Sequence, residues 1–218
     1  MSTLVLMKIL ESSPSRYDRG IKLLIGKKIY LAFDRITSKV QKDDNILDVG
    51  CGTGILSIMM AQNGVKVKGI DINPDMLEIA RTRVSNQNLS ELVTLEEKGV
   101  AELDSEVERT YHLITATLCF SELENYEIEY ALTHIHRILK PGGLFVLVDE
   151  IKPKNILKRI LLTFIRIPLV IITYILTQNT TKALKDIESK IVAEGFTIVE
   201  KYTNRLGSFI ELFCEKGE

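Results

Sequence analysis

The chain has 218 residues, of which 45% are hydrophobic and 26% charged, and its formal net charge is -1. This length and composition suit one globular domain and exclude a disordered chain, a collagen-like repeat or a low-complexity linker. The three cysteines are widely spaced and form no CxxC pair, so the sequence predicts neither a disulfide framework nor a metal site, and a reducing, cytoplasmic setting fits best.

Charge is distributed unevenly along the chain. Residues 8–42 and 151–185 are strongly basic, whereas residues 89–129 are strongly acidic. Blocks of this kind usually form solvated faces, but the two basic stretches could instead come together and face an anionic surface. The first residues show no basic segment or cleavage pattern typical of a signal peptide.

The spacing of apolar residues predicts helix in the first forty residues, and a different rhythm begins at residue 45. Short apolar runs alternate there with helical stretches, at 46–49, 65–71, 92–95, 112–117 and 144–150. Such a rhythm predicts an α/β fold with a doubly wound, mostly parallel sheet that is covered by helices on both faces. A ligand crevice should open at the carboxyl ends of the strands.

Two later runs, 196–202 and 209–215, flank a polar turn with Asn204 and Gly207, and they predict an antiparallel hairpin that completes a seven-stranded sheet. We therefore treat 1–218 as a single domain. Its expected parts are an N-terminal helical cap at 1–42, a cofactor-binding core at 43–151, an apolar and basic helical insertion at 152–185, and a C-terminal helix and hairpin at 186–218.

The segment 155–178 is apolar nearly all round and is interrupted by Arg159, Arg166 and Pro168. Its uncharged run is shorter than the roughly 20 residues that a helix needs to cross a bilayer. A helical cap over the substrate mouth is one interpretation. Peripheral membrane or partner contact through 152–178 is another, because several lysines precede the apolar stretch, and a membrane span is a third.

The stretch ILDVGCGTGILSIMMA, residues 46–61, carries the most information about chemistry. A buried strand ends there in a glycine-rich turn that leads into a helix, where the backbone permits close approach of a ligand. Asp71 ends the next strand and is placed to accept hydrogen bonds from ribose hydroxyls. A dinucleotide fingerprint would require glycine at Ile55, so a nicotinamide oxidoreductase is disfavoured.

These residues resemble the class I S-adenosylmethionine-dependent methyltransferases, which have a Rossmann-like methyltransferase fold. The resemblance rests on DVGCGTG at 48–54, GIDINPDMLEIAR at 69–81, GVAEL at 99–103 and LKPGG at 139–143. It implies S-adenosylmethionine as the cofactor. Val100 stands where many relatives carry an acid, so a carboxylate bond to the adenine amino group is not expected.

The resemblance also implies a role for each matching position in binding the cofactor. The methionine end would be held by Asp48, Gly50, Cys51, Gly52, Thr53 and Gly54. Asp71 would take the ribose, Ile72 and Met76 would flank the adenine, the backbone of Val100 and Ala101 would read its edge, and Leu118 would lie beside the sulfonium. Tyr17 resembles a tyrosine that closes over the cofactor; the alternative is an interfacial Tyr17 followed by a helix-capping Asp18.

A narrower resemblance links the chain to small methyltransferases associated with corrinoid proteins. It rests on residues outside the cofactor motifs, at 9–24, 118–123, 148–161 and 168–184. It implies either a small-molecule acceptor or a corrinoid-protein partner. No nucleic-acid partner is expected, and the sequence leaves the oligomeric state open.

Methyl transfer is an in-line displacement, and it requires a general base only when the acceptor must lose a proton. Glu150 is the favoured candidate among Glu122, Asp149 and Glu150, although an ion pair between Glu150 and a lysine of 152–158 competes with that role. Cys119 is expected to pack as a small buried side chain.

The leading hypothesis is methyl transfer to a small apolar molecule or to a corrinoid-protein-linked acceptor. The alternative is an accessory module that docks a corrinoid protein or a membrane surface without turnover.

Overall fold

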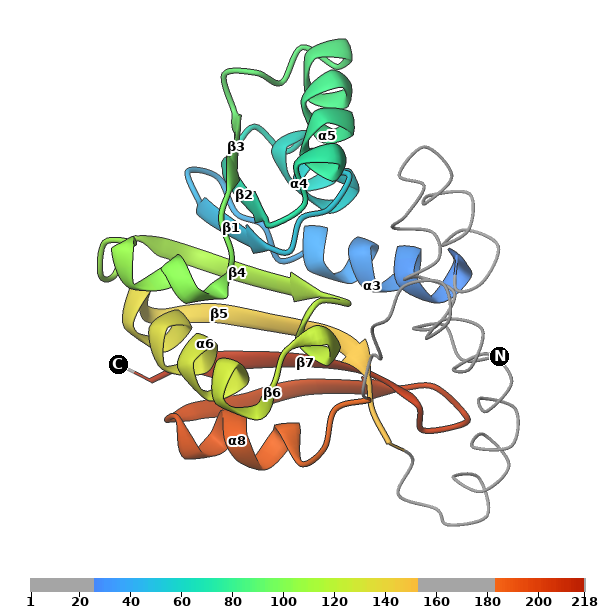
Figure 1. The fold of residues 1–218 in the computed structure, drawn as a ribbon, viewed down its shortest axis with the longest axis vertical. Coiled ribbons are helices and arrows are strands. Elements are labelled where there is room, and N and C mark those ends of the chain that lie inside the picture. Colours follow the sequence, from blue (N-terminus) through green and yellow to red (C-terminus); the bar gives the residue numbers. More distant parts are fainter. Residues whose placement is uncertain (1–25, 153–182, 218) are drawn as a thin grey trace.

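A computed structural model describes residues 26–152 and 183–217. The described chain forms a seven-stranded sheet in the order β3-β2-β1-β4-β5-β7-β6 (Figure 1). Its strands are β1 (Asn45–Val49), β2 (Lys66–Asp71), β3 (Val93–Glu97), β4 (Tyr111–Thr117), β5 (Leu139–Glu150), β6 (Phe196–Thr203) and β7 (Phe209–Lys216). The first five run parallel, and β7 pairs antiparallel with both β5 and β6. The predicted doubly wound sheet and its closing hairpin are confirmed.

Helices connect the parallel strands and cover both faces of the sheet (Figure 1). They are α3 (Gly26–Thr37), α4 (Ile55–Ala61), α5 (Pro74–Asn86), α6 (Asn125–Ile138) and α8 (Ile187–Ala193), with short 3-10 turns η1 (Val100–Ser105) and η2 (Phe120–Glu122). The central strands β1 and β4 are mostly apolar on both faces because each face is buried under a helical layer.

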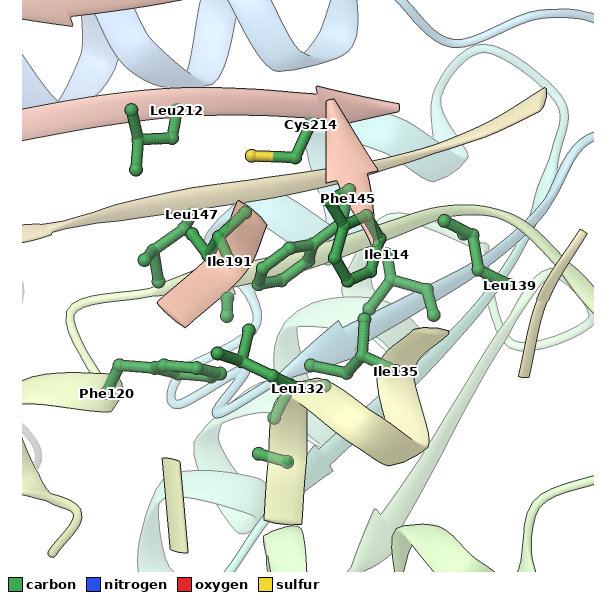
Figure 2. Packing of buried hydrophobic residues seen from close by; sticks show 14 of the residues in the cluster. Ile114, Phe120, Leu132, Ile135, Leu139, Phe145, Leu147, Ile191, Leu212 and Cys214 are labelled. Atoms are coloured by element: carbon green, nitrogen blue, oxygen red, sulfur yellow. The ribbon is translucent and has the colours of Figure 1, made fainter. Parts of the chain in front are cut away.

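Each face of the sheet has its own apolar core. On one face, α6 and α8 pack through residues such as Leu132, Ile135 and Ile191 against Phe145 and Leu147 of β5 (Figure 2). On the other face, α3, α4 and the C-terminal end of α5 meet the strands in a second cluster. The two cores hold the central strands rigidly, so the loops at their carboxyl ends project from a fixed frame.

Helix α3 is tied to the C-terminal hairpin by charge as well as by apolar packing. One Arg35 guanidinium nitrogen donates to both carboxylate oxygens of Glu211, at 2.9 and 2.7 Å. The same guanidinium carbon lies 4.3 Å from the centre of the Tyr202 ring. These contacts join a helix that precedes β1 to strands at the far end of the chain.

The structure differs from the sequence prediction mainly at the start of β5. The apolar run predicted a strand from residue 144, but pairing begins at Leu139, which lies opposite Tyr111. The register shifts between Tyr111 and Leu113, and Pro141, Gly142 and Gly143 occupy the irregular stretch. Their sequence is typical of a turn, and the irregularity accommodates them within one strand.

Most of the predicted insertion lies outside the described residues, as do Tyr17, Asp18 and most of the N-terminal cap. Within 26–152 and 183–217, none of the helices combines the length and the apolar character needed to span a bilayer. The interpretations of 152–178 as a cap, a docking surface or a membrane segment therefore stay predictions.

Candidate functional site

The glycine loop between β1 and α4 turns sharply at the centre of the sheet's carboxyl edge. Gly50, Gly52 and Gly54 have φ angles of 68°, 53° and 76°, which side chains rarely adopt. The backbone N–H groups of Gly50 and Cys51 donate to the Ile70 carbonyl at 2.8 and 3.0 Å. The loop is therefore fastened to β2 by the backbone itself.

The three glycines serve different purposes in the loop. A Cβ atom on Gly50 would lie 2.6 Å from the Cys119 Cβ atom, and one on Gly54 would lie 3.0 Å from the Ala80 Cβ atom on α5. A Cβ atom on Gly52 would meet nothing within 4 Å. Gly50 and Gly54 thus permit close packing within the protein, whereas Gly52 leaves open space where a ligand could approach the backbone.

Asp71 at the end of β2 lies directly beside this open space. Its carboxylate accepts the Gly52 N–H at 2.8 Å through Oδ2 and the Asn73 N–H at 2.8 Å through Oδ1. Burial raises the pKa of Asp71, and the two backbone hydrogen bonds work against that rise. Each oxygen keeps acceptor capacity, so the carboxylate is oriented for a further donor such as a ribose hydroxyl.

Asp48 lies beneath the loop and is 1% exposed. Ser57 Oγ of α4 donates to its Oδ2 at 2.6 Å, and Thr115 Oγ1 of β4 donates to its Oδ1 at 2.7 Å. Burial raises the pKa of Asp48 to about 6, although both hydroxyl bonds lower it. In this arrangement Asp48 joins β1, α4 and β4 from below; its direct contact with the methionine end stays a prediction.

An apolar surface adjoins Asp71 on the side of η1. The Ile72 side chain is 72% exposed, and its Cγ2 atom lies 2.9 Å from the position of a Cβ atom on Gly99. The next residues, Val100 and Ala101, begin η1. The structure thus places Ile72, Val100 and Ala101 together, as a flat purine base would require. Met76 is only 2% exposed, and its contact with adenine stays a prediction.

The remaining loop residues face inward. Cys51 is 8% exposed, and burial raises the pKa of its thiol. Thr53 is 3% exposed, and its carbonyl accepts a hydrogen bond from an Arg83 guanidinium nitrogen at 3.1 Å. These two positions shape the loop, and their direct contacts with a cofactor stay predictions.

The ends of β4 and β5 form the opposite wall of the carboxyl edge. Leu118 has a φ angle of 59° and is 7% exposed. The Cys119 thiol donates to the Val49 carbonyl at 3.3 Å, so the cysteine packs against β1, although it is half-buried rather than buried as predicted. Glu150 is 6% exposed and its carbonyl accepts the Leu184 N–H at 3.0 Å. Its role as a general base remains a prediction.

Several residues that shape the site were missed from the sequence. Asn73 caps α5, because its side chain accepts the N–H groups of Asp75 and Met76 at 3.0 and 3.2 Å. The Asn-Pro pair at 73–74 is the sequence signal for that cap. Ser57, Thr115 and Tyr130, whose hydroxyl donates to the Ala101 carbonyl at 3.1 Å, carry no comparable signal because their partners are distant in sequence.

The residues present fit S-adenosylmethionine. The space over Gly52 suits a close approach to the backbone, the oriented carboxylate of Asp71 suits a ribose, and the exposed face of Ile72 suits a base. The described ranges contain no group of three or more His, Cys, Asp or Glu side chains that could hold a metal ion.

Comparison with known proteins agrees with this geometry. Residues 46–143 match the family described as "Methyltransferase domain". The chain is 31% identical over 128 residues to a demethylmenaquinone methyltransferase of Chlorobaculum parvum, covering 58% of this chain and 49% of the relative. It is 29% identical over 171 residues to an uncharacterized methyltransferase of Synechocystis, covering 78% and 74%. The match thus spans about half the length of the demethylmenaquinone relative.

Solved structures share the fold at low sequence identity. The geranyl diphosphate C-methyltransferase of Streptomyces coelicolor, solved with Mg²⁺, geranyl diphosphate and S-adenosyl-L-homocysteine, superposes with a TM-score of 0.69 at 11% identity, covering 93% of this chain and 84% of that one. A possible exported protein of Bordetella parapertussis gives 0.71 at 17% identity, covering 88% and 68%. The fold is therefore the Rossmann-like methyltransferase fold, and residues 46–143 are similar to a methyltransferase domain.

Proposed function

We propose that this chain is an S-adenosylmethionine-dependent methyltransferase whose cofactor lies between the glycine loop and Asp71. The observation that carries the proposal is the bond of 2.8 Å between Gly52 N–H and the Asp71 carboxylate, beside open space over Gly52. The match of residues 46–143 to a methyltransferase domain supports it. When bound, the cofactor supplies a methyl group on a sulfonium.

Each residue has a defined part in that proposal. Asp71 accepts the ribose hydroxyls, Ile72 offers an apolar face to the adenine, and the backbone at Val100 and Ala101 borders the base edge. Asp48 holds the loop from below, and Leu118 lies on the side of the sulfonium. Most of the rate enhancement then comes from alignment of the acceptor with the methyl carbon and from exclusion of water.

The proposed acceptor is a small apolar molecule. The name of one relative supports this choice, because that relative is a demethylmenaquinone methyltransferase. An acceptor linked to a corrinoid protein is the second candidate, and it rests on the resemblance of residues outside the cofactor motifs. Glu150 would serve as a base only for an acceptor that loses a proton.

Calorimetric titration with S-adenosylhomocysteine tests the cofactor site directly. The intact chain should bind with micromolar affinity, and Asp71→Ala should weaken binding at least about tenfold, because a charge-assisted bond to the ribose is lost. Asp75→Ala is the matched control, since Asp75 lies in the first turn of α5 and is exposed. Wild-type affinity in Asp71→Ala would contradict the proposed site.

The acceptor is tested with methyl-labelled S-adenosylmethionine. Demethylmenaquinone in detergent micelles and free cob(I)alamin, as two separate probes, distinguish the apolar acceptor from the corrinoid acceptor by which one gains the label. Cofactor binding without label on either probe, combined with retention on vesicles, would favour the non-catalytic docking module.

The proposed membrane contact through 152–178 is tested by flotation with anionic vesicles. Replacing Lys152, Lys154, Lys158 and Arg159 together by alanine should reduce association, because each base near an anionic surface contributes about 1 kcal/mol. The affinity for S-adenosylhomocysteine serves as the control for folding. Unchanged flotation would remove the membrane role.

A further inference from the structure

The loop that follows β4 contains a residue in a costly backbone conformation. Leu118 has a φ angle of 59° although it is not glycine. This conformation costs roughly 1–2 kcal/mol for an L-residue and persists only when the surrounding structure holds it. The contacts that hold residues 118–121 therefore determine the shape of this loop.

Three hydrogen bonds fasten the loop to two strands. Leu118 N–H donates to the Val148 carbonyl at 2.8 Å, and the Cys119 thiol donates to the Val49 carbonyl at 3.3 Å. Ser121 N–H donates to Asp149 Oδ2 at 2.9 Å. Of the three acceptors, only Asp149 is a titratable side chain, and it is completely buried.

The loop also packs against the glycine loop. Cys119 leaves so little room at Gly50 that a Cβ atom there would lie 2.6 Å from the Cys119 Cβ atom and 2.9 Å from its sulfur. The charge of Glu122, in η2, is close enough to raise the pKa of Asp71, after the larger effect of burial. A shift of residues 118–122 would therefore disturb both parts of the proposed cofactor site.

We propose that Asp149 is a positioning residue for the cofactor, whose ionised carboxylate holds the 118–121 loop against the glycine loop. The inference rests on the proposed function. The Ser121 N–H bond favours the ionised carboxylate, so protonation of Asp149 weakens this bond, releases the strained turn at Leu118 and lowers cofactor affinity. Asp149 itself need not touch the cofactor, because it acts through Ser121 and Cys119.

The surroundings of Asp149 set the pH at which this change occurs. Burial raises the pKa of Asp149 to about 7, although the N–H groups of Ser121 and Glu150 donate to its carboxylate and lower it. The Glu150 carboxylate adds to the rise, and the Cys119 thiol also faces Asp149. Asp149 therefore gains or loses its proton near neutral pH. There only the molecules with an ionised carboxylate hold the loop firmly.

Titration with S-adenosylhomocysteine at pH 6, 7 and 8 tests the proposal on the full chain. Wild-type affinity should rise about five- to tenfold from pH 6 to pH 8, a coupling of ordinary size between two sites. Asp149→Asn should bind as weakly at pH 8 as the wild type does at pH 6. Asp43→Asn, an exposed position with a φ angle of 67°, is the matched control and should follow the wild type.

Hydrogen exchange gives a second measurement that does not depend on a variant. In the wild type, protection of the Ser121 amide should fall from pH 8 to pH 6 after correction for the intrinsic pH dependence, while protection in β1 and β4 stays constant. A constant protection factor at Ser121, or the wild-type pH dependence of binding in Asp149→Asn, would overturn the positioning role. A wild type that binds no S-adenosylhomocysteine at any pH would overturn the proposed function as well.

Discussion

Acidic side chains are held in two different ways in two regions of this sheet. Asp48, Asp71 and Asp149 at the carboxyl edge accept hydrogen bonds from hydroxyls and backbone N–H groups, and burial raises the pKa of each. A second group, which we call the charge network, joins β2, β3, the segment after η1 and the start of β4, and consists of Lys68, Glu96, Lys98, Glu106 and Tyr111.

In the charge network each acid has basic partners. Lys68 lies 3.0 Å from Glu96 and 2.7 Å from Glu106, and Lys98 lies 3.0 and 3.4 Å from the same two carboxylates. Partial burial raises the pKa of both glutamates, but the hydrogen bonds from the lysines outweigh it and lower both pKa values. This is the arrangement of a structural ion-pair network.

The opposite pKa shifts of the acids in the two regions correspond to their different roles. Burying an acid lowers stability, so a buried acid persists where the carboxylate or its hydrogen bonds are needed. At the carboxyl edge all three acids surround the glycine loop, either directly or through the 118–121 loop. The charge network does not surround the glycine loop. Its ion pairs and hydrogen bonds join β2, β3 and the start of β4.

The largest effect is expected at Gly50. Gly50→Ala should lower the free energy of unfolding by about 3 kcal/mol, because it adds a strained φ angle to an overlap with Cys119. Gly52→Ala has the same strain without overlap and should cost only about 1 kcal/mol. Urea denaturation of both variants measures the difference.

For cofactor binding, in contrast to stability, Gly52 is the position where a strong effect is expected. Gly52→Ala fills the open space beside Asp71 and should weaken S-adenosylhomocysteine binding at least about tenfold, whereas its fold is retained. Equal stability of the two variants, or full affinity in Gly52→Ala, would show that the loop packs differently from the arrangement described above.

The next effect concerns Asp48 and pH. Because its folded pKa is raised to about 6 from 3.8, the folded chain retains a proton that the unfolded chain releases, so stability from this group falls as pH rises from about 4 to 6. Asp48→Asn removes that dependence. The stability of the variant relative to the wild type should therefore increase by about 3 kcal/mol from pH 4 to pH 7. Urea denaturation at both pH values measures it, and a constant difference would contradict an uncharged Asp48 in acid.

Much of the fold follows from the sequence because its signals are local. The apolar runs at 46–49 and 112–117 are strands, and the turn at Asn204 and Gly207 forms the hairpin, with Gly207 at a φ angle of 67°. The early start of β5 was missed because Leu139 pairs with Tyr111 across a register shift. Such a pairing depends on a neighbouring strand and has no local pattern.

In the candidate site, too, features with a local sequence pattern were predicted and contacts between distant segments were not. The glycine loop and Asp71 were predicted because a strand, a turn and an acid at a fixed separation leave a local pattern. The hydroxyls of Ser57 and Thr115 and the Ser121–Asp149 bond were not, because each joins segments that only the fold brings together. The residues expected to meet the cofactor therefore carry local patterns, whereas the hydrogen bonds that hold the loops in place do not.

A smaller effect is expected in the charge network. Lys68→Met should lower stability at pH 7 by about 1–2 kcal/mol, between the values for exposed and buried ion pairs, because Lys68 is partly buried. Since the pKa values of Glu96 and Glu106 are lowered, the loss should shrink as pH falls below 4.5 and the carboxylates gain protons. Lys66→Met on the same strand is the exposed control, and neither variant should change S-adenosylhomocysteine affinity.

The smallest effect should come from the cap of α5, which lies between the two regions. Asn73→Ala removes the side-chain acceptor of the Asp75 and Met76 N–H groups and should cost about 1 kcal/mol. Asn73→Ser keeps an acceptor and should cost only a few tenths. Affinity for S-adenosylhomocysteine should stay within about twofold in both, because Asp71 is bonded by the backbone N–H of residue 73, which every side chain except proline retains. A serine variant as unstable as the alanine variant would show that the cap is not what stabilises this turn, and a large loss of affinity would show that the cap itself, rather than the backbone, orients Asp71.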